Sequence, residues 1–216
     1  MTTKNATMIG LALALLTLAY SALVFGSMPD RVPMHWNISG EVDGWASREW
    51  GTFGLPGAMI LCVGLLYALP WLSPRNFHVD PFRTTFNYVM LLIVVSVGLV
   101  HLLALQAARN PAMDSGRFIV VGVCLLVMLL GNVMGKVKRN FWVGIRTPWA
   151  LANDTVWAAT HRLGGRLMVG AGLVVAVCGA FGVAPAVCFV ALMSSLIVPA
   201  AYSLVFYKQL ERTARL

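Results

Sequence analysis

The chain has 216 residues, of which 59% are hydrophobic and only 11% charged, with a net charge of +8 and a mean hydropathy of +0.78. A soluble domain carries about 25% charged residues, so this composition excludes a water-soluble fold with an ordinary polar surface. The basic residues lie in short stretches between apolar runs, which indicates membrane topology rather than nucleic-acid binding.

Apolar runs close to the roughly 20 residues that cross a bilayer as a helix follow one another along the chain. They cover residues 8–26, 54–72, 86–107, 117–134, 166–184 and 186–206. The first run lacks the small-residue cleavage pattern of a signal peptide, so we expect it to be retained. The runs are continuous rather than alternating, so we expect no β structure. The predicted fold is an all-α, polytopic membrane bundle with six transmembrane helices in a single domain, residues 1–216.

The Lys and Arg residues between the runs predict the orientation, because cytoplasmic loops are enriched in them. The stretch at 135–165 and its border with the fifth run carry more of them than any other part of the chain. If both termini are cytoplasmic, twelve of the 16 Lys and Arg residues lie inside. We therefore expect the 135–165 stretch inside and the stretch at 27–53 outside.

The segment PMHWNISGEVDGW lies in the outer part of residues 1–53, after the first predicted helix. Its Pro, Asn, Gly and Asp residues favour turns, and its Trp residues prefer the membrane interface. Its His and acidic residues form a polar cluster that could recognise a peptide, a cation or a proton. The alternative is an interfacial cap on the bundle. The spacing matches no standard metal motif, and we expect no metal.

His101 is the ionisable residue that lies clearly inside a predicted span, and such residues are candidates for function. Two interpretations stay open: it points towards the outer acidic groups, or it is hydrogen-bonded to a neighbouring helix. The predicted ligand-binding residues are His35, Trp36, Glu41, Asp43, Trp45 and His101.

Residues 135–167, the inner stretch with its border, combine six basic residues with three Trp residues. Asn153 is a predicted N-cap of a short helix that ends at Gly164-Gly165, and residues spaced by four from it share one helix face. An interfacial segment bound to anionic headgroups would have a similar composition. The predicted partner-binding residues are Arg146, Trp149, Asn153, Trp157, His161 and Arg162.

The inner sequence GIRTPWALANDTVWAATHRLGGRL resembles the signature of the SdpI family, the immunity proteins for secreted peptide toxins. The outer sequence MPDRVPMHWNISGEVDGWASRE resembles the domain of unknown function usually found at the start of these proteins, with the pattern P-x-H-W-x-x-x-G-x-x-D-G-W. The resemblance covers most of the chain and implies a multi-pass protein of the bacterial plasma (inner) membrane. The best-studied type protects its own cell from a secreted killing peptide and captures a transcriptional repressor at the membrane.

The resemblance therefore implies an immunity or receptor protein whose partners are a secreted peptide toxin and a cytoplasmic repressor protein. The basic, Trp-containing inner stretch adds anionic lipids as expected partners. We expect no cofactor and no direct nucleic-acid binding. The alternative is a small-solute or ion transporter or channel, which would need polar residues or broken helices at mid-membrane. An enzyme is not expected, because no Asp or Glu falls within a predicted span and no activated nucleophile is apparent.

Overall fold

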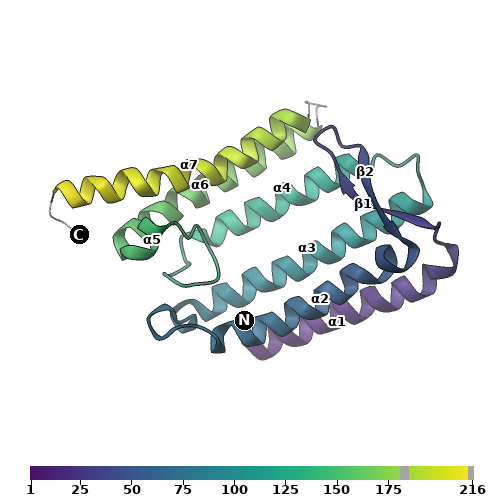
Figure 1. Cartoon of the computed structure of the whole chain (residues 1–216), viewed down its shortest axis with the longest axis horizontal. Helices are drawn as coiled ribbons and strands as arrows, with labels where there is room; N and C mark the ends of the chain where they lie inside the picture. The colour runs from purple at the N-terminus through teal and green to yellow at the C-terminus, as the bar shows by residue number, and fades with distance from the viewer. Residues whose placement is uncertain (181–184, 214–216) are drawn as a thin grey trace.

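The computed structural model describes residues 1–180 and 185–213, and long helices running side by side make up most of it (Figure 1). The long helices are α1 (Thr3–Val24), α2 (Arg48–Trp71), α3 (Arg83–Arg109), α4 (Ser115–Met134), α6 (Asp154–Ala180) and α7 (Pro185–Arg212). The short helix α5 is Pro148–Ala152, and the strands are β1 (Arg31–Trp36) and β2 (Val42–Ser47). Single 3-10 turns occupy Phe25–Ser27, Arg75–Phe77 and Asp80–Phe82.

Five helical segments of the described residues are long and apolar enough to cross a membrane. They are Thr3–Ser27, Arg48–Trp71, Arg75–Arg109, Ser115–Met134 and Ala186–Arg212. The predicted run at 166–184 begins within α6, and its last residues lie outside the described part of the chain. The chain is therefore a helical membrane bundle.

The helices fall into two sets of three. Within the first set α1, α2 and α3 contact one another, and within the second α6 packs against both α4 and α7. Contacts between α3 and α4, which run side by side in Figure 1, join the two sets. Apolar clusters fill each set, for example Met59, Val63 and Val94 in the first and Cys124, Val175 and Cys188 in the second.

The expectation of no β structure is wrong for the stretch between α1 and α2. Strands β1 and β2 pair antiparallel, with Arg31 opposite Ser47 and Pro33 opposite Trp45. Residues 42–47 alternate between half-buried and exposed, which is the pattern of a strand with one face on the protein. On the buried side Val32 packs with Met28 and Leu105, so the hairpin covers the ends of α2 and α3.

The helix that begins after Asn153 is also different from the prediction. Asn153 does cap it, since its Oδ1 accepts from the backbone N–H groups of Thr155 at 2.8 Å and Val156 at 3.2 Å. However, α6 runs unbroken through Gly164 and Gly165 to Ala180. A Cβ on Gly165 would lie 2.7 Å from the carbonyl oxygen of Gly131, so this glycine permits close contact between α4 and α6 rather than a break.

The α4–α6 contact can be tested with one methyl group. We expect Gly165→Ala to destabilise the protein by about 1–3 kcal/mol, the usual effect of overpacking, because the new Cβ meets backbone that cannot rotate away. Gly170→Ala on the same helix is the control, since nothing lies within 4 Å of its Cβ position. The measurement is the thermal unfolding midpoint in detergent. Equal midpoints for the two variants would contradict the close contact.

Candidate functional site

The tip of the hairpin is a turn organised by the side chain of Asn37. Its Oδ1 accepts from the backbone N–H groups of Ser39 at 2.9 Å and Glu41 at 3.0 Å. Its Nδ2 donates to the Glu41 carboxylate at 3.1 Å, and the positive φ of 83° at Gly40 completes the turn. The turn therefore holds the exposed Glu41 carboxylate at a fixed place on the tip.

His35 and Asp43 face each other across the two strands. His35 Nδ1 lies 2.5 Å from Asp43 Oδ1, and both side chains stay largely open, with 70% and 45% of their surfaces exposed. A hydrogen-bonded pair this exposed contributes little to folding stability. Two polar groups that are ordered but accessible are suited to contact a ligand.

The tip is also fixed to the start of α4. Trp36 Nε1 donates to Ser115 Oγ at 2.9 Å. A Cβ on Gly116 would lie 2.1 Å from the carbonyl oxygen of Gly40, so the two backbones are in direct contact. The hairpin, which follows α1 in the chain, thereby reaches across to the second set of helices.

A pocket of about 410 Å³ lies where the tip meets the second set. This volume falls in the range of small-ligand sites. The tip contributes polar and aromatic groups, and α4 and α7 contribute apolar side chains. The lining residues are His35, Trp36, Asn37, Ile38, Gly40, Gly116, Ile119, Val120, Val123, Cys188, Phe189 and Leu192.

The structure divides the predicted ligand-binding residues. His35 and Trp36 line the pocket, Glu41 and Asp43 lie beside them on the hairpin, and Trp45 is 54% exposed but is not part of the lining. His101 lies elsewhere. It is fully buried, and its Nε2 is 2.7 Å from Ser21 Oγ on α1.

The position of His101 selects one of its two interpretations. Ser21 Oγ already donates to the Thr17 carbonyl at 2.9 Å, so the Nε2–H of His101 donates to Ser21. His101 thus ties α3 to α1 inside the first set, which is the hydrogen bond to a neighbouring helix that the sequence left open.

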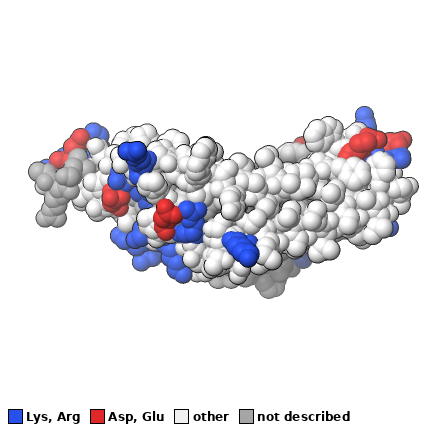
Figure 2. Space-filling model, turned by 90° about the horizontal axis from the view of Figure 1, so that it is seen from below, with Lys and Arg blue, Asp and Glu red and all other residues white. Residues whose placement is uncertain are grey.

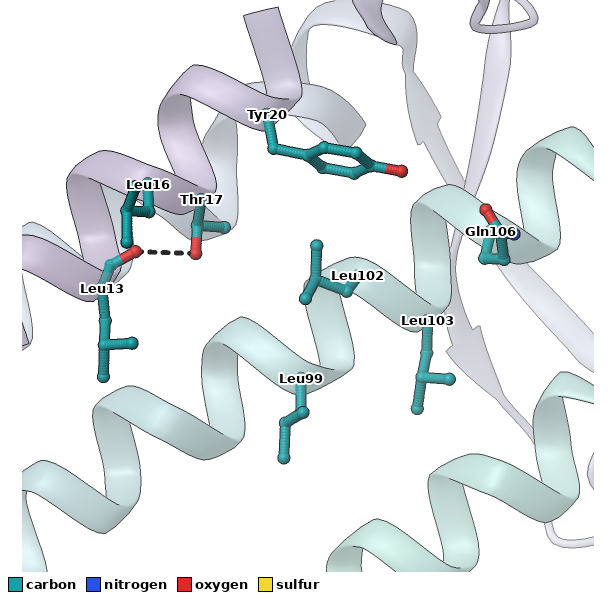
Figure 3. Close-up of a pocket in the computed structure, with 8 residues that line it drawn as sticks. All are labelled: Leu13, Leu16, Thr17, Tyr20, Leu99, Leu102, Leu103 and Gln106. Atoms are coloured by element: carbon teal, nitrogen blue, oxygen red, sulfur yellow. Dashed lines mark hydrogen bonds between the residues drawn. The ribbon is translucent and has the colours of Figure 1, made fainter. Parts of the chain in front are cut away.

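A second hollow of about 640 Å³ lies between α1 and α3. Figure 3 shows Tyr20 and Leu102 pointing into the space between the two helices. Its lining is Leu13, Leu16, Thr17, Tyr20, Leu99, Leu102, Leu103 and Gln106, without a charged residue. The Thr17 hydroxyl donates to the Leu13 carbonyl at 2.8 Å. This hollow fits lipid hydrocarbon, and none of the predicted ligand-binding residues lines it.

The opposite end of the molecule is basic. Most of the Lys and Arg side chains visible in Figure 2 gather there, where α5 lies and α7 ends, with a few acidic side chains among them, and the hairpin end shows side chains of both signs. The face between the two ends is mostly uncharged (Figure 2). This distribution matches a bundle that spans a membrane with its charged ends in water.

Residues 135–147 at the basic end form a folded plug, a name we use for this segment from here on. Its centre is Asn140, which is fully buried. Asn140 Nδ2 donates to the carbonyls of Lys138 and Val143, and its Oδ1 accepts from the backbone N–H groups of Trp142 and Val143. Trp142 Nε1 donates to Ser73 Oγ at 2.8 Å and so ties the plug to the end of α2.

Two of the predicted partner-binding residues, Trp157 and His161, lie beneath the plug and not on the surface. They are 2% and 1% exposed and stack with ring centroids 4.0 Å apart. Trp157 Nε1 donates to the Val137 carbonyl at 2.8 Å. The four-residue spacing from Asn153 does place them on one helix face, but that face packs inwards.

Both ring nitrogens of His161 are hydrogen-bonded, one to the plug and one within α6. The backbone N–H of Ile145 donates to Nε2 at 3.0 Å, so Nε2 carries no proton and Nδ1 donates to the Trp157 carbonyl at 2.8 Å. Burial lowers the pKa of His161 from 6.5 to about 4, against a smaller opposing effect of the bond to Trp157. The ring is therefore neutral near pH 7.

The remaining predicted partner-binding residues are accessible. Arg146 and Arg162 are exposed, and Trp149 and Asn153 are half-buried. The Arg146 guanidinium donates to the Phe141 carbonyl, and this bond holds the Arg146 side chain against the plug. Arg139, which sequence reasoning did not single out, instead holds Asp154 at 2.8 Å and so clamps the plug to the start of α6.

Metal and cysteine chemistry find little support in the part of the chain that the structure describes. Within it, no three His, Cys, Asp or Glu side chains come together to hold a metal ion. Cys124 and Cys188 pack in the apolar cluster between α4, α6 and α7. The side chain of Cys178 lies outside the described residues.

Sequence reasoning missed most of the pocket. Ser115 and Gly116 stand at the start of α4, where a small or polar residue is ordinary, and nothing in the sequence pairs them with the hairpin. The apolar lining from α4 and α7 has the same composition as a lipid-facing surface. The role of Asn140 could have been predicted from one feature of the sequence. Asn in a short loop favours a turn that its own side chain stabilises by hydrogen bonds to the backbone.

Comparisons with known proteins find two family models and one relative that match this chain. Residues 136–203 match the model described as the SdpI/YfhL protein family, and residues 12–60 match a domain of unknown function, DUF1648. The chain is 23% identical over 173 residues to the immunity protein SdpI of Bacillus subtilis (strain 168), covering 80% of this chain and 81% of that protein. No solved structure matches. The chain is thus a multi-pass bacterial membrane protein.

The neutral state of His161 predicts a pH dependence of stability. Above pH 6.5 the ring is neutral both folded and unfolded, so it has no effect. Between pH 6.5 and about 4 the unfolded chain binds a proton that the folded one does not, so stability falls as pH falls. Carboxylates also titrate in this pH range, so the contribution of His161 is isolated by comparing the wild type with His161→Gln. Gln cannot titrate, but its side-chain oxygen can still accept from the backbone N–H of Ile145. We expect its unfolding midpoint in detergent to fall less over this window, and parallel curves would refute the assignment.

Proposed function

We propose that this chain, which belongs to the SdpI/YfhL protein family, is a membrane immunity protein that protects its cell from a secreted membrane-active peptide. The relative from Bacillus subtilis carries the name of an immunity protein and is matched over most of both chains. That name describes the relative. The argument for proposing the same function for this chain comes from the geometry of its own pocket.

The pocket beneath the hairpin tip is the observation that carries the proposal. It joins His35 and Trp36, from the stretch matched by one family model, to apolar residues of α7 such as Phe189, from the stretch matched by the other. Its walls are apolar and its rim is polar, which suits a peptide that partitions into membranes. Binding there keeps such a peptide from acting on the bilayer or on its target.

We further propose six spans with both termini in the cytoplasm. In support, α1 begins and α7 ends on the side of the molecule away from the hairpin (Figure 1). The basic end carries the plug and the first turns of α6, with Arg146, Arg162 and Arg166 exposed. The positive-inside rule assigns this end to the cytoplasm and the hairpin to the outside, where a secreted peptide arrives.

The exposed basic residues of the inner end are our proposed surface for a cytoplasmic partner, such as a transcriptional repressor. Arg146 and Arg162 offer charge, and the half-buried Trp149 offers an aromatic edge beside them. Anionic lipid headgroups would meet the same guanidinium groups. Trp157 and His161 belong to the support of this surface and not to its contact area.

A transporter or channel is the competing function, and the site geometry favours it less. His101 is used in a bond between α1 and α3, and the hollow between these helices has no charged lining residue. A polar path through the bundle would need such groups to face a shared cavity. We likewise propose a non-enzymatic role, since the accessible His35–Asp43 pair has no nucleophile among its hydrogen-bond partners.

The proposed orientation is tested by fusing reporters to the C-terminus. We expect a green fluorescent protein fused there to fluoresce and an alkaline phosphatase to be inactive, because the first folds in the cytoplasm and the second needs the oxidising outside. An active phosphatase at the C-terminus would reverse the assignment of the hairpin and the plug. Phosphatase inserted after Ser39 at the tip is the matching control and should be active.

The immunity function is tested by survival. A sensitive bacterium that expresses this protein is challenged with a panel of secreted membrane-active peptides, and we expect protection against at least one. Asp43→Asn should remove most of that protection without lowering membrane abundance, because it removes the accessible charge next to the pocket. Glu49→Gln is the control, an acidic residue in the first turn of α2 that does not line this pocket.

Two outcomes would count against this proposal. If no peptide of the panel is resisted while the protein is inserted at normal levels, weight moves to transport, and solute flux in liposomes is the next assay. If Asp43→Asn and Glu49→Gln have equal effects, the hairpin does not recognise the peptide through this group.

A further inference from the structure

We infer that the pocket beneath the hairpin tip takes a bulky apolar side chain of a cationic peptide, which reaches it sideways from the lipid along α4 and α7. This inference rests on the proposed immunity function and specifies the chemistry of the ligand. Three features of the pocket carry it: an apolar floor, an acidic rim, and an approach through exposed apolar residues.

The floor of the pocket comes from two helices of the second set. Ile119 and Val123 contribute from α4, and Phe189 and Leu192 contribute from α7. These side chains give the ligand apolar contact and no charge. A volume of about 410 Å³ is large enough for an aromatic or branched side chain with part of its backbone. The floor therefore selects bulk and apolarity rather than a particular polar group.

The roof of the pocket is the hairpin tip, which is held in place on the α4 side. Trp36 lines the pocket while its indole N–H is held by Ser115, so its ring is oriented before a ligand arrives. Ile38, also in the lining, is 52% exposed and adds an apolar edge at the mouth. A roof already fixed by hydrogen bonds lowers the entropy lost on binding.

The rim of the pocket is acidic. Glu41 is exposed at the tip, and Asp43 is held next to His35, itself a lining residue. Arg117 directly follows the lining residue Gly116, and the carboxylate of Asp114, which accepts from the backbone N–H of Arg117, adds an acidic group beside it. A Lys or Arg side chain, or a free amino terminus, next to the bound apolar group would meet these carboxylates.

The approach to the pocket is from the membrane side. The first turns of α7 expose Val187, Phe189 and Val190 by 50% or more, and Phe118 at the start of α4 is 52% exposed. Large exposed apolar residues at a helix end in a membrane protein face lipid. Trp45 and Trp50 on the hairpin and α2 mark the interface level at the same end. A peptide that lies in the interface thus meets the pocket without leaving the membrane.

The test uses the full chain in nanodiscs of zwitterionic phosphatidylcholine and a defined probe, a fluorescent helical peptide of Leu and Lys. Its twin has Gln in place of every Lys. Val123→Trp places an indole in the pocket, and Leu125→Trp, two residues along α4 and outside the lining, is the matched control. Binding is measured by fluorescence anisotropy.

We expect the wild-type protein and Leu125→Trp to bind the Leu/Lys probe with similar affinity. Val123→Trp should weaken binding about tenfold, which corresponds to excluding one large apolar side chain. The Leu/Gln twin should bind the wild type more weakly than the Leu/Lys probe, and this difference should vanish in the Glu41→Gln, Asp43→Asn double variant. Equal binding to Val123→Trp and Leu125→Trp, or no preference for Lys over Gln, would overturn the inference.

A mapping measurement keeps the test independent of how the variants fold. A probe that carries photo-leucine is cross-linked to the wild-type protein, and the modified residues are identified by mass spectrometry. Cross-links at Ile119, Val123 and Phe189 support the pocket. Cross-links that concentrate on Leu16 and Leu99 would place the peptide in the hollow between α1 and α3 and overturn the inference.

The outcomes separate this inference from the immunity function. Probe binding with the expected pattern in a protein that protects no cell would leave the pocket standing and remove the proposed function. Protection that survives Val123→Trp at unchanged abundance would leave the function standing and remove the pocket.

Discussion

The hydrogen bond from the Ile145 backbone to His161 Nε2 fixes the basic end of this protein. It requires a neutral ring whose other nitrogen donates to the Trp157 carbonyl. It also requires glycine at 144, where φ is +117° and a Cβ would lie 2.3 Å from Nε2. The plug is therefore built around one imidazole ring. A substitution that displaces this ring would also displace the adjacent backbone, which carries Arg146.

The plug and the hairpin hold the two sets of helices together at opposite ends. At the basic end the plug bonds to Ser73, just after α2, and, through Thr147, to Ser203 of α7 at 2.7 Å. At the other end the hairpin bonds to Ser115. One helix, α7, carries both Leu192 in the pocket and Ser203 beside the plug. These residues are about 16 Å apart along a helix, so a displacement of α7 as a rigid body would be felt at both ends.

The sequence predicted the features that depend on hydropathy and on local capping. The apolar runs gave the long helices because a lipid-exposed backbone must satisfy its own hydrogen bonds. Asn153 was recognised as a cap because its bonds reach only two and three residues along the chain. Both kinds of signal are contained in one short window of sequence.

The features that the sequence did not predict depend on contacts between distant residues. The hairpin strands are only six residues each, too short for alternation to stand out beside long apolar runs. Trp157 among basic residues has the composition of an interfacial anchor, and only its bond to Val137, 20 residues away, shows that it is buried. Gly164 and Gly165 break an isolated helix, but here their missing side chains admit Ile145 and Gly131.

The location of the pocket follows from the way polarity is distributed in the molecule. On the face shown in Figure 2, charged residues gather at the two ends, and uncharged residues cover most of the surface between them. A membrane-active peptide is itself amphipathic, and it is most stable at the boundary between these regions, with its charges in water and its apolar face in lipid. In the proposed arrangement the pocket lies at this boundary, with the charged Glu41 towards water and the apolar Phe189 towards lipid. A protein that binds such a peptide there need not extract it from the interface, so the contact energy is available for recognition.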